Sequence, residues 1–309
     1  MSATTPQTTA TVPVRSRSKS RAISGGHQDP TRKGGWGTRV ALIVACVLWT
    51  LPTLGLLITS FRSKDDAVTS GWWSALANPF STQWTFANFD AAIFDNNMGV
   101  AFVNSIVVAI PATVIPIMFA AFAAYAFTFM RFRGRDFLFV VVVSLLVVPI
   151  QVAFVPMLRL FGGDGLDIIG QFIAVWLLHT GFGMPLAIYI LRNYMATLPR
   201  TIIESADIDG ATHFQTFWRL IVPMSVPALA AFAIFQFLWV WNDLLIALLF
   251  LGTGNPVVTV QLQQLLGRLG EGWQLVAAGA FFTMTVPLFV FFTLQRFFVR
   301  GLTAGSVKG

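Results

Sequence analysis

The chain holds few residues that could carry out chemistry, and their spacing matches no catalytic or metal-binding motif. It lacks the G-x-x-x-x-G-K-[ST] pattern that holds nucleotide phosphates and the H-E-x-x-H pattern of zinc peptidases. The three histidines, His27, His179 and His213, are expected to lie too far apart to share a metal. No nucleophile stands with a base in a hydrolase-like arrangement. We therefore predict no catalytic residue, no metal site and no cofactor bound by this chain. Its predicted role is to transport or hold another molecule, with energy supplied by a partner.

Most of the chain is too apolar to face water. Hydrophobic residues make up 56% of the sequence and charged residues only 11%, whereas a soluble domain carries about 25% charged residues. Six windows contain no Asp, Glu, Lys or Arg and reach the roughly 20 residues that a membrane-spanning helix needs: residues 40–61, 96–130, 137–158, 168–191, 220–242 and 272–295. Open strands cannot satisfy their backbone groups in lipid. The sequence therefore predicts an all-α, polytopic membrane protein with six transmembrane helices.

The placement of positive charge predicts the orientation. With the N-terminus in the cytoplasm, all Lys and Arg residues except Arg62, Lys64, Arg159 and Arg268 fall on the cytoplasmic side, as the positive-inside rule requires. We therefore predict a multi-pass cell-membrane protein with both termini cytoplasmic. The net charge of +7 then reflects topology and contact with anionic membrane lipid rather than nucleic acid.

The two ends of the predicted bundle differ in composition. Residues 1–38 are rich in Ser, Thr, Gly, Pro, Arg and Lys, which predicts a disordered basic cytoplasmic tail ahead of a transmembrane domain at 39–309. Residues 61–98 form a predicted external loop rich in Trp and Phe. Such aromatics favour anchoring at the lipid headgroups, and a surface that receives a partner is the alternative.

Polar residues within the apolar windows, or directly after one, are candidates for a substrate pathway. The candidates are Asn104, Gln151, Asn242 and Asp243. Prolines in the second and third windows remove backbone hydrogen bonds and favour kinks beside some of these residues. Ordinary packing between helices is the alternative for each of them.

Asp243 and His179 are the ionisable candidates inside the spans. Asp243 is the one acidic residue expected within a span, because the fifth span is predicted to run from about Met224 to Phe250. A charge there costs about 2.5–3.5 kcal/mol on insertion scales. A functional role and a structural hydrogen bond to a neighbouring helix are equally favoured for it. For His179 the pattern favours a packing residue with its polar atoms satisfied over a ligand.

The stretch 201–227, TIIESADIDGATHFQTFWRLIVPMSVP, is predicted to form a docking element of two short helices. Thr201 with Glu204, and Thr212 with Gln215, have the spacing of capping boxes that begin helices. Gly210 between them can adopt a positive φ and end the first helix. Apolar residues recur on one stripe at helical spacing: Ile203, Ala206, Phe214, Phe217, Trp218 and Ile221. Since this loop is predicted to be cytoplasmic, the element would face a cytosolic partner.

This stretch resembles the EAA loop of binding-protein-dependent ABC import permeases. Glu204-Ser205-Ala206, three residues, Gly210, nine residues and then Leu220-Ile221-Val222-Pro223 is similar to the family pattern E-A-A, three residues, G, nine residues, I-x-L-P, before the penultimate span. Ser205 and Leu220 depart conservatively from it. Asn104-Ser105, Trp241-Asn242-Asp243 and the terminal GLTAGSVKG resemble the sugar-importing, maltose/maltodextrin-type branch. The segments LWVWNDLLIALLFLG and LQRFFVRGLTAGSVKG look most like α-glucoside permeases. The likeness covers about residues 39–309.

The resemblance implies a fold, a function and partners. The fold is that of type I, MetI-like permeases, with a coupling loop at about 193–223. The function implied is import of a di- or oligosaccharide of the α-glucoside type, driven by ATP and Mg that bind a separate ATPase. The partners are a second permease subunit, a cytosolic ATPase dimer and an extracytoplasmic sugar-binding protein.

The resemblance also assigns residues to these partners. The residues implied for ATPase coupling are Glu204, Ser205, Ala206, Asp209, Gly210, Ala211 and Pro223. The tail residues implied to reach the ATPase are Gly305, Ser306, Val307, Lys308 and Gly309. The external loop at about 253–272 is implied to reach into the cleft of the binding protein.

Three rival functions remain open at this point. An ABC permease for a different small polar solute would share all of these features. A secondary transporter would need no ATPase, but it usually shows inverted repeats and several buried ionisable residues, whereas one acidic residue lies within the predicted spans. A membrane-anchored scaffold would need neither kinked spans nor a loop of this pattern.

Overall fold

The computed structural model describes residues 35–163, 165–266 and 272–303, apart from the side chains of residues 294 and 296–303. The chain divides into two units, Met1–Thr50 and Leu51–Gly309. In the described part of the first unit, residues 36–50 form the beginning of helix α1, and the Thr50 hydroxyl donates to the carbonyl of Cys46 at 2.7 Å. Most of the predicted basic tail lies outside the described residues.

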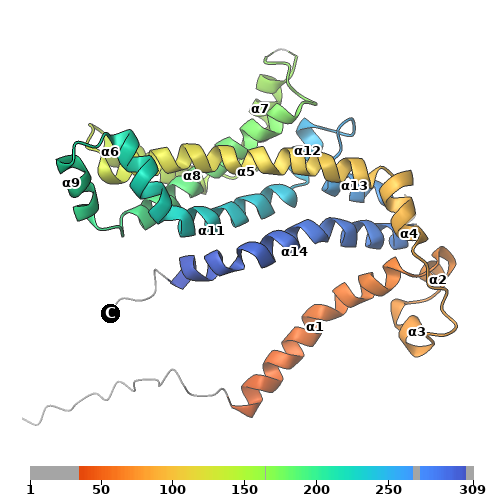
Figure 1. The fold of residues 1–309 in the computed structure, drawn as a ribbon. Helices are drawn as coiled ribbons and strands as arrows, with labels where there is room; N and C mark the ends of the chain where they lie inside the picture. The colour runs from red at the N-terminus through yellow and green to blue at the C-terminus, as the bar shows by residue number, and fades with distance from the viewer. Residues whose placement is uncertain (1–34, 164, 267–271, 304–309) are drawn as a thin grey trace, which may run out of the picture. The chain divides into compact units, whose positions relative to one another are not determined.

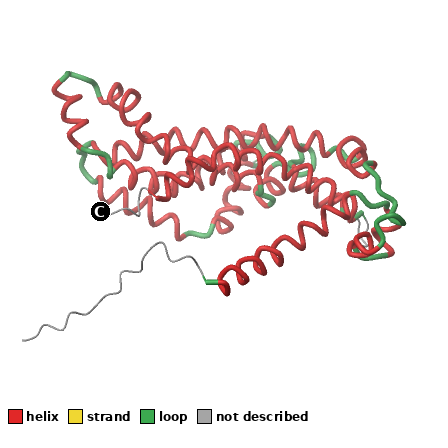
Figure 2. The backbone as a smooth tube through the Cα atoms, turned by 60° about the horizontal axis from the view of Figure 1, so that its bottom comes forward, coloured by secondary structure: helices red, strands yellow, loops and turns green. Residues whose placement is uncertain are grey.

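The described residues fold into helices joined by loops, and their β-type pairing is limited to one isolated bridge between Arg62 and Trp84 (Figures 1 and 2). The α-helices are α1 Trp36–Ser60, α2 Lys64–Thr69, α3 Trp72–Ala77, α4 Ala87–Asp90, α5 Met98–Phe129, α6 Arg135–Ser144, α7 Phe154–Phe161, α8 Phe172–Met195, α9 Arg200–Ile208, α10 His213–Thr216, α11 Val222–Trp241, α12 Leu245–Phe250, α13 Val258–Leu265 and α14 Trp273–Thr303. Short π-helical turns lie at Ala91–Asp95 and Phe217–Ile221, and 3₁₀ turns at Leu145–Val147 and Ile150–Ala153.

Five helical segments of the described chain are long and apolar enough to cross a membrane: Trp36–Ser60, Met98–Phe129, Phe172–Met195, His213–Trp241 and Trp273–Thr293. Their positions agree with five of the six predicted windows. The remaining window, 137–158, forms two helical pieces that meet at a bend of 95°. A sixth span is counted only if this bent pair crosses as one.

The bend has a local cause in Pro149. A proline ring clashes with a helical conformation in the preceding residue and pushes it toward extended backbone. Val148 accordingly adopts φ −77° and ψ 119° and ends the first piece. A new 3₁₀ turn begins at Ile150, directly after the proline. The expectation of one kinked helix through this window is therefore replaced by two helical pieces.

The helices α5, α8 and α11 pack against one another, and α14 packs against α11 (Figure 1). Their buried side chains form two apolar clusters. One cluster joins the first halves of α5 and α8 to α7, α12 and α13. The other joins the last halves of α5 and α8 to α9 and the beginning of α11. The bundle therefore holds each of its two end regions with a separate part of the core.

Helix α5 runs unbroken through Pro111 and Pro116, although each proline leaves a carbonyl four residues earlier without its helical donor. The indole N–H of Trp176 on α8 donates to the carbonyl of Val107 at 3.0 Å. The side-chain amide of Gln236 on α11 donates to the carbonyl of Ala112 at 3.0 Å. Neighbouring helices thus supply the donors that the two prolines remove, and the same bonds fix α5 against α8 and α11.

The segment after α1 is folded rather than an open loop. Arg62 is 2% exposed, and its guanidinium donates to the carbonyls of Asp66 and Ser70. The side-chain amide of buried Asn88 donates to the carbonyls of Ser60 and Arg62, at 2.9 and 2.8 Å. These bonds tie α2 and α4 to the end of α1. The alternative roles of the aromatic residues in this segment, lipid anchoring or partner binding, stay predictions.

Candidate functional site

The predicted docking element is present as two short helices, but the first begins earlier than expected. Helix α9 starts at Arg200, directly after Pro199, whose backbone has φ −62° and ψ 124°. Thr201 therefore lies inside the first turn, and no side chain caps this helix. The backbone carbonyl of Thr201 accepts a hydrogen bond from the Ser205 hydroxyl at 2.8 Å. The prediction of a capping box at Thr201 and Glu204 was wrong. Pro199 occupies the N-cap position, so the helix already begins at Arg200, one residue before Thr201.

The hinge and the second capping box agree with the prediction. Gly210 has φ 75°, a conformation that residues with a side chain rarely adopt. The hydroxyl of Thr212 accepts from the backbone N–H of Gln215 at 3.3 Å, and the Gln215 side chain accepts from the backbone N–H of Thr212 at 2.8 Å. Both halves of the box are formed. The chain thus turns at Gly210 and starts α10 at once.

A hollow of about 620 Å³ lies between the two short helices. Five residues of the predicted coupling set line it: Ser205, Ala206, Asp209, Gly210 and Ala211. Its wall is completed by Ile202, Gln215, Thr216, Arg219 and Leu220. The other two residues of the set, Glu204 and Pro223, are exposed and lie outside its lining. The element therefore presents a concave surface with an exposed carboxylate beside it.

The element is anchored to α5 by polar and aromatic contacts. The Tyr125 hydroxyl lies 3.0 Å from Nδ1 of His213, and the ring of Phe122 stacks on that of Phe217 with centroids 4.4 Å apart. Four residues of the predicted apolar stripe are buried, namely Ile203, Ala206, Phe217 and Ile221. The other two do not follow the prediction, since Phe214 and Trp218 are exposed at 66% and 37%. The π-helical turn at 217–221 changes the helical spacing there.

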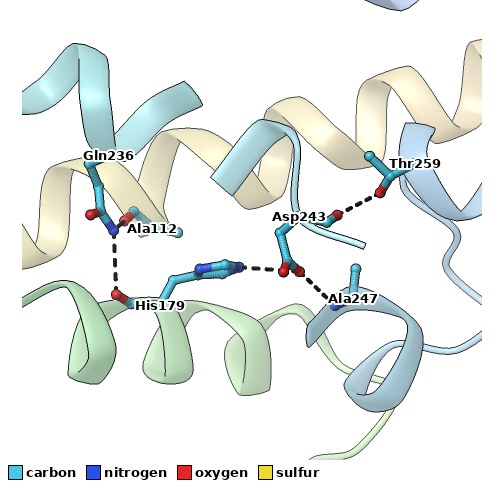
Figure 3. A network of polar contacts seen from close by, with 6 residues as sticks. All are labelled: Ala112, His179, Gln236, Asp243, Ala247 and Thr259. Atoms are coloured by element: carbon cyan, nitrogen blue, oxygen red, sulfur yellow. Dashed lines mark hydrogen bonds and ion pairs between the residues drawn. The ribbon is translucent and has the colours of Figure 1, made fainter. Parts of the chain in front are cut away.

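A polar cluster lies between α8, α11 and α12, where Asp243 approaches His179 (Figure 3). Nε2 of His179 lies 3.8 Å from Oδ2 of Asp243. The imidazole is completely buried, and neither ring nitrogen has a hydrogen-bond partner. The histidine is buried as expected of a packing residue, but the expectation that its polar atoms are satisfied was wrong. The sequence could not show the pairing, because 64 positions separate the two residues.

The sequence predicted that Asp243 lies within a continuous helix, but the structure has a helix break at this residue. The helical run ends at Trp241 and starts again at Leu245. Oδ2 of Asp243 accepts a hydrogen bond from the N–H of Ala247 at 3.0 Å, in the first turn of α12. Its carbonyl accepts from the hydroxyl of Thr259 at 2.6 Å (Figure 3). The carboxylate thus satisfies a backbone group that the break would leave unpaired.

The start of α5 binds the segment 256–259, which lies near this cluster. The side-chain amide of Asn104 donates to the carbonyl of Pro256 at 2.9 Å. The hydroxyl of Ser105 accepts from the N–H of Val258 at 2.9 Å. Ser105 and Asp243 also line the same small cavity. Two of the four pathway candidates, Asn104 and Asp243, are therefore connected through one segment.

The other two pathway candidates lie apart from this arrangement. Gln151 is exposed in the 3₁₀ turn after the bend. Asn242 is also exposed, and its side chain donates to the carbonyl of Leu238 at 2.7 Å. The cavity beside His179 and Asp243 measures about 10 Å³, which is about the space of one water molecule. A sugar does not fit there in this conformation.

Three further predictions concern the C-terminal tail, metal binding and the external loop. The tail residues 305–309 lie outside the described part of the chain. Within the described ranges, no group of three His, Cys, Asp or Glu side chains is placed to hold a metal ion. The external loop is described as far as residue 266 and contains α13.

Sequence reasoning missed the side chains that pair with the proline-freed carbonyls. Trp176 and Gln236 are the donors. The prolines themselves were the available signal. A proline at position i leaves the carbonyl at i−4 without its helical donor, and no water replaces that donor in lipid, so a side chain must supply one. Polar side chains are scarce in these spans, so the donors could have been sought among them.

Comparison with known proteins identifies the class. Residues 112–304, more than half of the chain, match the family model described as binding-protein-dependent transport system inner membrane component. The osmoprotective compounds uptake permease protein GgtD of Synechocystis sp. is 53% identical over 87% of this chain and 91% of its own length. The alpha-glucoside transport system permease protein AglG of Rhizobium meliloti is 40% identical over 91% of this chain and its whole length.

A solved structure agrees with this assignment at the level of the fold. The crystal structure of a bacterial ABC transporter involved in the import of the acidic polysaccharide alginate matches 86% of this chain and 99% of that one, with a TM-score of 0.67 and 19% identity. The chain belongs to the binding-protein-dependent transport system inner membrane component family. It is a multi-pass inner-membrane permease subunit of an ABC importer, not the ATPase, and members of the family bind no cofactor themselves.

Proposed function

We propose that this chain is one permease half of an ATP-driven sugar importer and that its α9–α10 element couples the ATPase to the spans. The observation that carries the coupling proposal is the hollow of about 620 Å³ around Gly210. It is lined by most residues of the family-like motif, and α10 beside it is fastened to α5. A partner helix or loop seated there would move α5 when it moves.

The proposed partners follow from the importer class. A cytosolic ATPase dimer would bind the α9–α10 element and the tail residues 305–309. A second, related permease subunit would complete the translocation pathway, and an extracytoplasmic binding protein would deliver the solute to the end that carries residues 253–272. This arrangement places both termini and the 193–223 loop in the cytoplasm, with the membrane domain spanning 39–309.

For the substrate we propose a di- or oligosaccharide of the α-glucoside type. The relative from Rhizobium meliloti is an alpha-glucoside permease, and it aligns over its whole length. A second candidate, an osmoprotective compound, is favoured by the more identical relative from Synechocystis sp.. Asn104 and Asp243 are the residues that we propose near the pathway, because they fasten the segment 256–259 to the spans.

The coupling proposal is tested by reversing one charge on the exposed edge of α9. Glu204→Lys is expected to abolish transport and substrate-stimulated ATP hydrolysis in the reconstituted importer while the chain still inserts into the membrane. Asp207→Lys is the matched control, because Asp207 is exposed on the same helix and lies outside the hollow. It should retain most of the transport activity. Normal transport with the Glu204 variant, or equal loss with the control, would contradict the proposed role.

The substrate proposal is tested by uptake competition. Cells or proteoliposomes that carry the whole importer take up a labelled α-linked disaccharide, and unlabelled maltose, trehalose or glycine betaine is added as competitor. We expect α-linked sugars to compete and glycine betaine to have no effect. Competition by glycine betaine alone would replace the sugar with a non-sugar osmoprotectant.

A further inference from the structure

A cluster of arginines surrounds two neighbouring hollows at the end of the bundle where α5, α6 and α8 meet. A hollow of about 540 Å³ is lined by Arg131, Phe132, Gly134, Arg135, Asp136, Phe137 and Arg200. A second one of about 70 Å³ is lined by Phe127, Thr128, Phe129, Arg135, Arg192, Ala196, Leu198 and Arg200. Because two arginines line both, the hollows form one arginine site with four guanidinium groups.

The charge of the arginine site is largely uncompensated. Asp136 is the one acidic residue in either lining. It pairs with Arg135 at 2.9 Å, and its own side chain is 82% exposed. Among the described residues, no other carboxylate lies within ion-pair distance of the site. Four positive groups beside one peripheral carboxylate leave a net positive charge that attracts anions.

Arg192 is held in a position that leaves part of its binding capacity unused. Its guanidinium carbon lies 4.6 Å from the ring centre of Phe139, which is a cation–π geometry. One terminal nitrogen reaches the Asn193 side chain at 3.5 Å. Its Nε is buried and has no hydrogen-bond partner. A planar guanidinium with free donors is well suited to phosphate oxygens.

The position of the arginine site indicates which anion it meets. It lies at the shared ends of membrane helices, since α5 ends at Phe129 and α6 begins at Arg135. Phe137, one of its lining residues, is 70% exposed, and Phe132 is 40% exposed. A small dissolved anion would leave these rings in water, whereas a lipid covers them with its acyl chains. Basic pockets at the ends of transmembrane helices are a known mode of binding acidic headgroups.

We propose that the arginine site binds the phosphate headgroup of an anionic phospholipid in the adjacent leaflet. The larger hollow falls within the roughly 300–1,000 Å³ range of small-molecule pockets. Arg135 and Arg200 lie at the centre, where they line both hollows, and Phe137 contacts the lipid chains. The arginine site shares Arg200 with the start of α9 but none of the residues that line the hollow around Gly210.

The test is a lipid titration of the full-length chain in detergent, followed by native mass spectrometry. We expect phosphatidylglycerol to bind at least about tenfold more tightly than phosphatidylcholine. Removing one basic charge near a headgroup weakens binding about fivefold, so Arg135→Gln with Arg200→Gln should weaken it about 25-fold. Arg133→Gln is the matched control in the same loop, since Arg133 is exposed and lines neither hollow; it should change binding less than twofold.

Several outcomes would overturn the proposal. Equal affinity of the unaltered chain for both lipids would do so, and this result does not depend on any variant folding. Equal loss with Arg133→Gln would reduce the site to general surface charge. Displacement of the lipid by inorganic phosphate at equal concentration would assign the site to a free anion. Unchanged lipid binding with lost ATPase co-purification would assign the arginines to the ATPase.

Discussion

Replacing Gln236 with leucine tests whether this side chain compensates for a proline on another helix. Pro116 has no N–H, so the carbonyl of Ala112 lacks its helical donor, and the Gln236 amide supplies one at 3.0 Å. Gln236 is 3% exposed and Ala112 is completely buried. Gln236→Leu keeps the approximate volume but leaves that carbonyl unpaired.

The size of the effect is bounded by two considerations. An unpaired buried polar group costs about 1–3 kcal/mol, while hydrogen bonds between membrane helices average about 0.6 and reach about 1.7 kcal/mol. Because Pro116 removes the helical donor of the Ala112 carbonyl, we expect the loss to lie near the upper value, at about 1–1.5 kcal/mol. The amide also donates to the carbonyl of His179 at 3.4 Å. That carbonyl stays paired in the variant, because the N–H of Gly183, four residues later in α8, remains its helical donor.

The assay is a double-mutant cycle with Pro116→Ala, read as the free energy of unfolding. Unfolding of the detergent-solubilised chain in a sodium dodecyl sulfate titration can be followed by fluorescence, since the chain has 10 tryptophans. An alanine at position 116 restores the helical donor. In that background the cost of Gln236→Leu should fall below about 0.5 kcal/mol, which gives a coupling energy of about 1 kcal/mol.

A parallel cycle tests the same reasoning at the other proline, and a crossed pair is the control. Trp176→Phe removes the donor to Val107, and Pro111→Ala restores the helical one. Combining Gln236→Leu with Pro111→Ala should be additive within about 0.5 kcal/mol, because the two changes affect different carbonyls. If Gln236→Leu and Pro116→Ala are equally additive, the amide does not replace the missing donor and the explanation is refuted.

Two further predictions follow from close contacts. A Cβ added at Gly183 would lie 2.7 Å from Oε1 of Gln236, so Gly183→Ala should displace that amide and cost about 1–2 kcal/mol in the same titration. Gly181→Ala is the control, because a Cβ there meets no atom within 4 Å, and equal costs would contradict the prediction. Tyr125→Phe removes the hydroxyl that lies 3.0 Å from Nδ1 of His213. It should raise hydrogen exchange in α10 with a loss of about 1 kcal/mol or less in global stability, and unchanged exchange would show that other contacts hold α10.

Local signals predicted much of this fold because they need only neighbouring residues. Charge-free windows located five spans, and the sixth failed as a single helix only because Pro149 forces Val148 into extended backbone. The Gly210 hinge and the Thr212 cap are also local and were predicted correctly. The wrong cap at Thr201 shows the limit, since two start signals lay close together and the proline prevailed.

The site could not be predicted to the same extent, because its contacts join helices far apart in sequence. Each span is apolar on nearly every side, so periodicity does not tell which face meets which neighbour. The pairing of His179 with Asp243 depends on that choice, and also on a helix break that no proline or glycine marks. The four pathway candidates were all polar residues in or directly beside apolar windows, but only Asn104 and Asp243 contact the same segment.

The contacts of α5 explain how its two ends can be mechanically connected. At one end Ser105 holds the segment 256–259, and at the other Tyr125 holds α10. A helix rises about 1.5 Å per residue, so the 32 residues of α5 extend over about 48 Å. Two prolines would normally weaken such a helix, but donors from α8 and α11 replace the lost bonds. A displacement of the α9–α10 element can therefore reach segment 256–259 by rigid movement of α5, whereas the helical pair that bends at Pro149 has no continuous backbone ladder to carry it.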